Sequence, residues 1–310
     1  MGLLHKPSRD EGQENMIPRR NLLIVLTHGL RSDALGDSQT WPLHTPNLQS
    51  LGERSLRLVA TSACPADPGA MMSLVTGQHP RQHGRLEQCN DAATPWARDP
   101  LAAEGFPDWL KAEGYHVTGV GCVGQFSRAM HEPVVVAQVD DASPQGCAYT
   151  VASASRGMAA AVAQQRKQRQ RGGWFDPDRL LLEPDDDIDG FIAAEASKKL
   201  RDMPTDKPWA LVVAFSGPGN ELPPPPMYAD VVDPGETSVM SSLVDFMNVD
   251  AVAELDYPRA VLQRMQPHKL GRVRADYLGR VSLIDFAVGR LQREMEDRLD
   301  APRTWVMLTS

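Results

Sequence analysis

The chain has 310 residues, of which 42% are hydrophobic and 23% are charged, so it is long and apolar enough to form a full globular core. Its formal net charge of -8 argues against a nucleic-acid-binding protein, which usually carries a basic face. The four cysteines are widely spaced and include no CxxC pair, so a disulfide framework is not implied at this size and a zinc site has no support.

Neither a leader nor a membrane-spanning segment is predicted. Residues 1–20 contain no apolar stretch of the kind found in secretory signals, so we expect a disordered polar tail there and a cytoplasmic protein. No segment approaches the roughly 18–20 apolar residues needed to cross a bilayer, so we expect no membrane partner.

Strand and helix patterns alternate along the chain from residue 21. Strands are expected at 22–26, 55–60, 115–121, 133–136, 209–215 and 303–310, and helices at 45–51, 69–75, 106–113, 148–171, 190–200 and 273–299. The run 209–215 is apolar on both faces, as in a strand that helices cover on both sides. The sequence therefore predicts an α/β fold with one domain over 21–310, built on a mostly parallel sheet with helices on both faces.

The longest helical pattern lies near the end of the chain. From Val273 to Leu299 its apolar residues recur every three or four positions, which places them on one face of an α-helix. The strand at 303–310 follows it, and a central strand normally leads into a further loop and a covering helix.

Two charged clusters lie close together in the sequence. The cluster at 166–171 is basic and the cluster at 185–189 is acidic. We interpret them as a solvated, charge-balanced connection, and prefer this to a patch that binds a polyanion.

A polar loop directly follows the first predicted strand and contains His28, Arg31 and Asp33. Ligands of open α/β sheets bind at the carboxyl ends of the strands, so we expect the functional site at this loop and at the segment 66–80. We expect Arg31 and Asp33 to fix the structure of the loop, without contacting a substrate.

The order of these segments resembles the start of the sulfatases, which belong to the alkaline phosphatase superfamily. The similarity rests first on NLLIVL, LRSDALG, TPNL and SLVTGQHPRQHG, which occur in this order between residues 21 and 84. It continues at 109–115, 206–209, 226–230 and 305–310. An alkaline phosphatase/sulfatase-like fold is therefore expected over most of 21–310.

The resemblance implies a hydrolase of sulfate esters. Family members hold a divalent cation, usually calcium, with acidic side chains at strand ends, and calcium prefers oxygen ligands. Their nucleophile is a formylglycine made from the cysteine or serine of a C/S-x-P-x-R motif. Lysine, arginine and histidine side chains bind the sulfate group and protonate the leaving group.

This sequence departs from the family pattern at the positions that carry the chemistry. The pair of metal-binding aspartates aligns with His28 and Gly29, and the nucleophile position aligns with Asp67. The proline and arginine of the nucleophile motif align with Gly69 and Met71. We therefore expect no bound cofactor, because most of the ligands that hold calcium in the family are missing.

Further departures follow along the chain. The family's lysine and histidine after the 115–121 strand align with Cys122 and Gly124, and a later histidine aligns with Gly219. The next metal-binding motif would begin directly after Ser310. The chain is therefore identified as a degenerate and C-terminally truncated member of the family.

Two residues keep a possible chemical role, and each also has a simpler explanation. His28 is a candidate metal ligand, or a polar residue left at a strand end. Asp67 is a candidate nucleophile, or the residue that caps the helix after Pro68. We prefer the simpler explanation for both.

Three hypotheses follow. The chain is a pseudoenzyme whose former cleft binds a protein or a small anionic ligand, or it is a fragment of a longer family member. The alternative is a divergent metal-dependent sulfuric ester or phosphoric ester hydrolase that uses Asp67 with His28.

Overall fold

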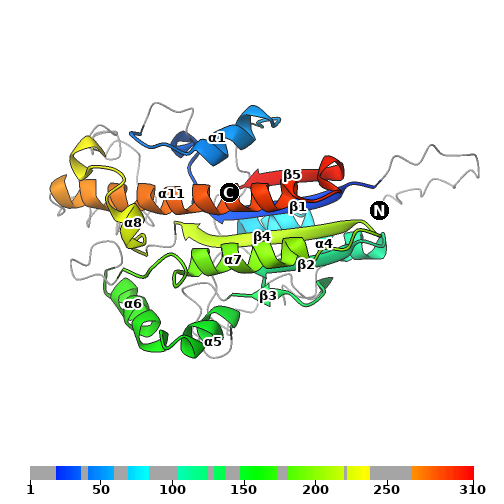
Figure 1. The fold of residues 1–310 in the computed structure, drawn as a ribbon, viewed down its shortest axis with the longest axis horizontal. Coiled ribbons are helices and arrows are strands. Elements are labelled where there is room, and N and C mark those ends of the chain that lie inside the picture. Colours follow the sequence, from blue (N-terminus) through cyan, green and yellow to red (C-terminus); the bar gives the residue numbers. More distant parts are fainter. Residues whose placement is uncertain are drawn as a thin grey trace, which may run out of the picture.

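A computed structural model describes residues 19–35, 41–58, 69–83, 104–124, 129–136, 147–172, 181–219, 222–237 and 267–310. Five strands form one sheet in the order β3-β2-β4-β1-β5 (Figure 1). Their bounds are β1 Asn21–His28, β2 His116–Gly121, β3 Val134–Val135, β4 Trp209–Pro218 and β5 Thr304–Thr309. All the pairings between these strands are parallel, which confirms the predicted α/β sheet.

The centre of the sheet is apolar on both sides. All ten residues of β4 are buried, as expected for a strand between two layers of helices. In β1, Leu23 and Val25 belong to one core cluster, whereas Ile24 and Leu26 belong to another. Successive side chains of a strand point to opposite faces, so β1 contributes to the core on both sides of the sheet.

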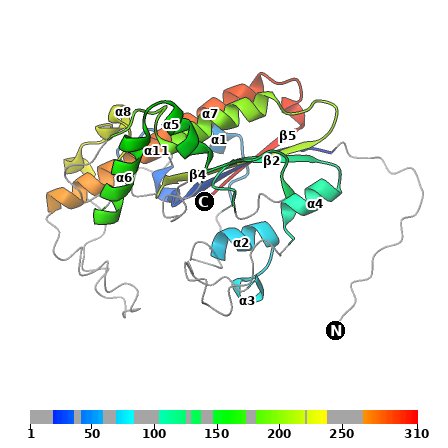
Figure 2. The same ribbon diagram turned by 90° about the horizontal axis from the view of Figure 1, so that it is seen from below.

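Helices cover the two faces unequally, as Figure 2 shows. One face carries the long helices α7 and α11 together with α1, α5, α6 and α8, and the other carries α2, α3 and α4. The bounds of the helices on the first face are α1 Pro46–Glu53, α5 Ala148–Ser155, α6 Ala159–Gly172, α7 Ile188–Arg201, α8 Pro226–Ala229 and α11 Pro267–Glu296. Those on the second are α2 Gly69–Thr76, α3 Pro80–His83 and α4 Phe106–Ala112. Short 3-10 helices lie at η1 Ser32–Ala34, η5 Pro234–Thr237 and η7 Ala301–Arg303.

Three predicted elements differ from the structure. The described part of the strand predicted at 55–60 is not a strand, and Leu56 and Leu58 there are 86% and 77% exposed. The helix predicted at 148–171 is two helices, because the chain turns at Gly157 with a φ of +76°. The final helix ends at Glu296, and Leu299 lies beyond it, 98% exposed. Among the described helices, none is both long and apolar enough to cross a membrane.

Helix α1 begins with a cap supplied by another helix. Its own N-cap residue, Thr45, makes no capping bond with its side chain. Instead, Asp285 of α11 accepts hydrogen bonds from the backbone N–H of Leu48 at 2.8 Å and from the side-chain amide of Asn47 at 2.7 Å. The carboxylate therefore satisfies the helix terminus and attaches α1 to α11.

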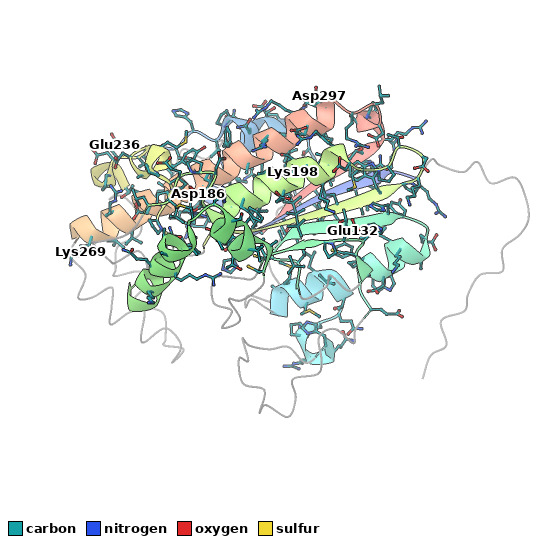
Figure 3. All side chains as sticks on the ribbon, turned by 60° about the horizontal axis from the view of Figure 1, so that its bottom comes forward. Glu132, Asp186, Lys198, Glu236, Lys269 and Asp297 are labelled. Carbon is teal, nitrogen blue, oxygen red and sulfur yellow. The ribbon has the colours of Figure 1, made fainter. Side chains whose placement is uncertain are left out.

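Replacing Asp285 by alanine should lower the free energy of unfolding by about 1–3 kcal/mol, because a buried N–H loses its acceptor. Urea unfolding of the purified variant measures the loss. The matched control is Asp297→Ala, a change at an exposed aspartate just beyond α11 (Figure 3), which should stay within about 0.5 kcal/mol of the parent. Equal losses in the two variants would contradict the capping role.

Two histidine rings, those of His116 and His131, lie together where β2 begins. The rings of His116 and His131 have centroids 4.9 Å apart. Burial lowers the pKa of His116, and the positive charges of His131, Lys207 and Lys199 lower it further. The folded protein therefore resists protonation at His116 more strongly than the unfolded chain does.

Stability should consequently fall as the pH drops below about 6.5, the ordinary pKa of histidine, because the unfolded chain takes up the proton first. Above that pH both states are neutral at this position and the residue contributes no pH dependence. Thermal unfolding between about pH 5 and pH 8 should show a shallower acid loss for His116→Asn than for the parent. An unchanged pH profile in the variant would assign the acid sensitivity to other groups.

Candidate functional site

The carboxyl ends of β1, β2, β4 and β5 meet at one edge of the sheet, because these strands are parallel. The segment 28–31 follows β1 and 122–124 follows β2. The β4 strand ends in 217–219, and β5 is followed by Ser310. These four segments form the floor of the candidate site, which we call the cleft floor.

Tyr277 of α11 holds the loop that follows β1. Its hydroxyl donates to the carbonyl of Gly29 at 3.0 Å and accepts from the N–H of Arg31 at 2.9 Å. The Arg31 guanidinium in turn binds both carboxylate oxygens of Asp33, at 2.8 and 2.7 Å. This hydrogen-bonded ion pair raises the pKa of Arg31 and lowers that of Asp33. The predicted structural role of Arg31 and Asp33 agrees with this geometry.

The same loop is also attached to the end of β5. The N–H of Leu30 donates to the hydroxyl of Ser310 at 2.9 Å, and the hydroxyl of Thr27 donates to the carbonyl of Thr309 at 3.3 Å. The ends of β1 and β5 are therefore fixed to each other beyond the regular pairing of the two strands.

A charged cluster is buried directly behind the end of β4. Arg280 of α11 is 0% exposed and binds Asp187 at 2.5 Å and also Asp189, both at the start of α7. The second oxygen of Asp189 accepts from the N–H groups of Ser216 at 2.7 Å and Gly217 at 3.2 Å. One carboxylate thus connects α11, α7 and the carboxyl end of β4.

The pKa values of this cluster reflect burial opposed by charge. Burial raises the pKa of Asp189, against the lowering effects of Arg280 and of the two backbone N–H donors. Burial also lowers the pKa of Arg280, but Asp187 and Asp189 outweigh it, so that pKa is raised and the guanidinium stays charged.

Two glycines allow the ends of β1 and β4 to touch. The N–H of Gly219 donates to the carbonyl of His28 at 2.8 Å. A Cβ atom added to Gly29 would lie 3.1 Å from the Cα of Gly219, and Gly29 has a φ of +72°. Position 29 therefore suits glycine on both counts, since an L side chain there would be strained and crowded.

The structure places some of the candidate site residues and leaves the roles of others as predictions. His28 lies at the end of β1 with an exposed side chain, and its role as a metal ligand stays a prediction. Asp67 lies outside the described residues, so its role also stays a prediction. Cys122 lies at the end of β2, where its N–H donates to the carbonyl of Ala214 at 2.8 Å. His83 is buried and within 3.0 Å of the Ser73 hydroxyl, in agreement with a structural role.

The described side chains of the cleft floor do not fit a calcium site. Calcium takes six to eight oxygen ligands, mainly carboxylates. The floor instead offers the imidazole of His28, the thiol of Cys122 and the hydroxyl of Ser310. Within the described ranges, no three histidine, cysteine, aspartate or glutamate side chains are grouped so that they could hold a metal ion.

The prediction that the acidic cluster at 185–189 is a solvated connection is wrong for Asp187 and Asp189. Asp187 and Asp189 are 1% and 0% exposed, and Arg280 forms an ion pair with each of them in the interior. A signal for this pairing is present in the sequence. Arg280 falls on the apolar face of its helix, three residues after Tyr277 and four before Ile284, where a lone charge requires a partner.

An apolar groove of about 360 Å³ lies on the face of the sheet that carries α2, α3 and α4. It is bordered by Leu22 and Ile24 of β1, Met307 of β5 and Trp109 of α4. These β1 residues precede the carboxyl end of the strand, so the groove lies apart from the cleft floor.

A parallel sheet between helical layers, with loops gathered at the carboxyl ends of its strands, defines the class of α/β proteins that bind ligands at this edge. The family model for Sulfatase matches residues 20–310, and the chain belongs to the sulfatase family. No curated protein matches the chain in sequence.

Solved structures of the alkaline phosphatase superfamily share this fold. The phosphonate monoester hydrolase of Agrobacterium radiobacter is 17% identical with a TM-score of 0.68, over 94% of this chain and 62% of that one. A putative sulfatase from Bacteroides fragilis is 19% identical with a TM-score of 0.58, over 99% and 63% of the two chains. One from Bacteroides thetaiotaomicron is 15% identical with a TM-score of 0.60, over 94% and 57%. The chain therefore spans about three fifths of the length of these proteins.

Replacing Arg280 by methionine should lower the free energy of unfolding by about 3–5 kcal/mol, because Asp187 and Asp189 would remain buried without a counter-charge. Urea unfolding at neutral pH measures the effect. Arg293→Met, on an exposed position of the same helix, is the control and should change stability by less than about 0.5 kcal/mol. A loss near that of the control would show that water or other groups compensate the two carboxylates.

Proposed function

We propose that this sulfatase-family chain has lost sulfate-ester hydrolysis and keeps the cleft as a binding site for a small anionic ligand. The contact between Gly29 and Gly219 is the observation that carries the proposal. Position 29 aligns with a metal-binding aspartate of the family, and the structure leaves little space there for a side chain. A Cβ atom at this position would require the backbone of Gly219 to shift by a few tenths of an ångström, and the positive φ of Gly29 would strain an L residue.

The other substitutions support the same conclusion. His28 offers an imidazole where the family has a carboxylate, and Met71 cannot neutralise an oxyanion. Cys122 and Gly219 take the places of a lysine and a histidine that bind or protonate the substrate in the family. Catalytic groups act as a unit, so the loss of several of them leaves little rate enhancement.

Binding of an anion is supported by the groups that remain. The side chains of His28 and Arg31 are both exposed beside the end of β1, and both can donate hydrogen bonds. Asp33 binds Nε and Nη2 of the Arg31 guanidinium, and none of the contacts between described residues involves Nη1, so this nitrogen could donate to a ligand. This arrangement suits a small oxyanion better than a bulky apolar ligand.

The alternative is a divergent sulfuric ester or phosphoric ester hydrolase that uses Asp67 as nucleophile and His28 as ligand of a transition-metal ion. Its support is the exposed position of His28 at the end of β1.

Turnover distinguishes the two functions. The purified protein should hydrolyse neither an aryl sulfate nor an aryl phosphate faster than its Asp67→Ala variant, with or without added zinc, manganese or calcium. Metal analysis of the purified protein accompanies the assay. Turnover that Asp67→Ala abolishes would overturn the proposal and establish the divergent hydrolase.

Inorganic sulfate is the probe for the binding half of the proposal. It should raise the melting temperature of the protein in a concentration-dependent way, because a ligand that binds only the folded state stabilises it. Arg31→Ala should weaken this response, whereas Arg293→Ala on the far side of α11 should leave it unchanged. Equal responses in both variants would place any bound sulfate outside the cleft.

A further inference from the structure

Hydrogen bonds around the cleft floor form a closed circuit that begins and ends on α11. Arg280 of α11 binds Asp189, which accepts from the N–H groups of Ser216 and Gly217 at the end of β4. This half of the circuit fixes the carboxyl end of β4 to two helices.

The other half returns to α11 through β1. Two residues beyond Gly217, the N–H of Gly219 donates to the carbonyl of His28. The next carbonyl, of Gly29, accepts from the hydroxyl of Tyr277. Tyr277 and Arg280 are three residues apart and therefore lie one turn apart on the same side of the helix.

The contacts on this path leave it little freedom. Arg280 and Asp189 are both 0% exposed, so water cannot replace either partner. Gly29 and Gly219 touch backbone to backbone, so neither loop can move toward the other. The register of β1 against β4 shifts between Leu26 and His28, and His28 then pairs with Pro218. The circuit adds further contacts to the pairing at this irregular point.

We propose that Tyr277 and Arg280 are positioning residues, and that this circuit holds the ends of β1 and β4 together without a metal ion. In the family, the resemblance implies that an acidic pair after β1 binds a divalent cation, whereas the position after β4 that aligns with Gly219 is a histidine. Here His28 and Gly29 occupy the positions of the acidic pair and Gly219 occupies that of the histidine, and a backbone hydrogen bond joins the two strand ends. The inference rests on the proposed function only in taking the cleft floor to be the ligand site.

The circuit has a non-local consequence. Consecutive hydrogen bonds of the circuit involve the same loop or adjacent residues, so they depend on one another. Loss of one hydrogen bond should therefore also increase the mobility of the loop on the opposite side of the circuit. Tyr277 touches no residue of the β4 segment in the bonds described above, and Arg280 touches none of the loop after β1. Each substitution should nevertheless affect the other loop.

Hydrogen–deuterium exchange on the full chain, followed by mass spectrometry, tests this consequence. The variant Tyr277→Phe keeps the ring and removes only the hydroxyl. It should speed exchange by about tenfold in peptides covering 28–31 and, to a smaller extent, in peptides covering 215–219. Tyr115→Phe is the matched control, since it removes a hydroxyl that donates to the carbonyl of Arg20 at 3.0 Å at the opposite ends of the strands. It should leave both peptides unchanged.

Asp189→Asn gives the reciprocal test, because it weakens the circuit at the end of β4 and keeps the shape of the side chain. It takes the place of Arg280→Met if that variant is too unstable to study. It should speed exchange in 215–219 and also in 28–31. Adding EDTA or calcium to the parent protein should change neither peptide.

Faster exchange confined to the peptide beside each substitution would overturn the circuit as a unit. Faster exchange of both peptides on adding EDTA to the parent would show that a cation joins the strand ends. Neither result depends on turnover or on sulfate binding, so failure of the proposed function is recognised separately by the aryl sulfate and inorganic sulfate experiments.

Discussion

The buried ion pairs of Arg280 with Asp187 and Asp189 are the constraint on which the site depends. Removing three charges from water is costly, and the cost is offset in part where the charges are paired and hydrogen-bonded, as in the two ion pairs of Arg280. The match requires the start of α7, the middle of α11 and the end of β4 to lie in one arrangement. Packing of apolar side chains alone would tolerate small shifts between these elements, whereas the charged cluster does not.

Helix α11 carries this constraint across the molecule. Tyr277 attaches it to the loop after β1, and Asp285 attaches it to α1. Two glycines let other segments approach the surface of α11 closely. A Cβ atom on Gly279 would overlap the carbonyl oxygen of Tyr228, and one on Gly289 would overlap the side chain of Asn47. The helix lies along the sheet in Figure 1 and supports the loop after β1 directly and the end of β4 through Asp189.

The family scaffold is therefore kept while its polar groups are redistributed. In the family, acidic groups face the cleft and bind a cation. In this chain the described acidic groups near the strand ends make contacts within the protein. Asp189 binds backbone N–H groups, and Asp33 binds Arg31. Because the fold rests on apolar layers and on α11, it does not require the groups that perform the family's reaction.

The sequence by itself determined the strands β1, β4 and β5, most of α11 and the family, because apolar periodicity and ordered motifs are local features of the chain. It also identified His28 and Gly29 as departures from the metal-binding pattern. Only the tertiary structure decided that Asp189 is buried, since its partner Arg280 is 91 residues away in the sequence and a run of acidic residues normally faces water. It also decided that the apolar residues of 55–58 form no strand and that Gly29 must be small, because both depend on which segments become neighbours in space.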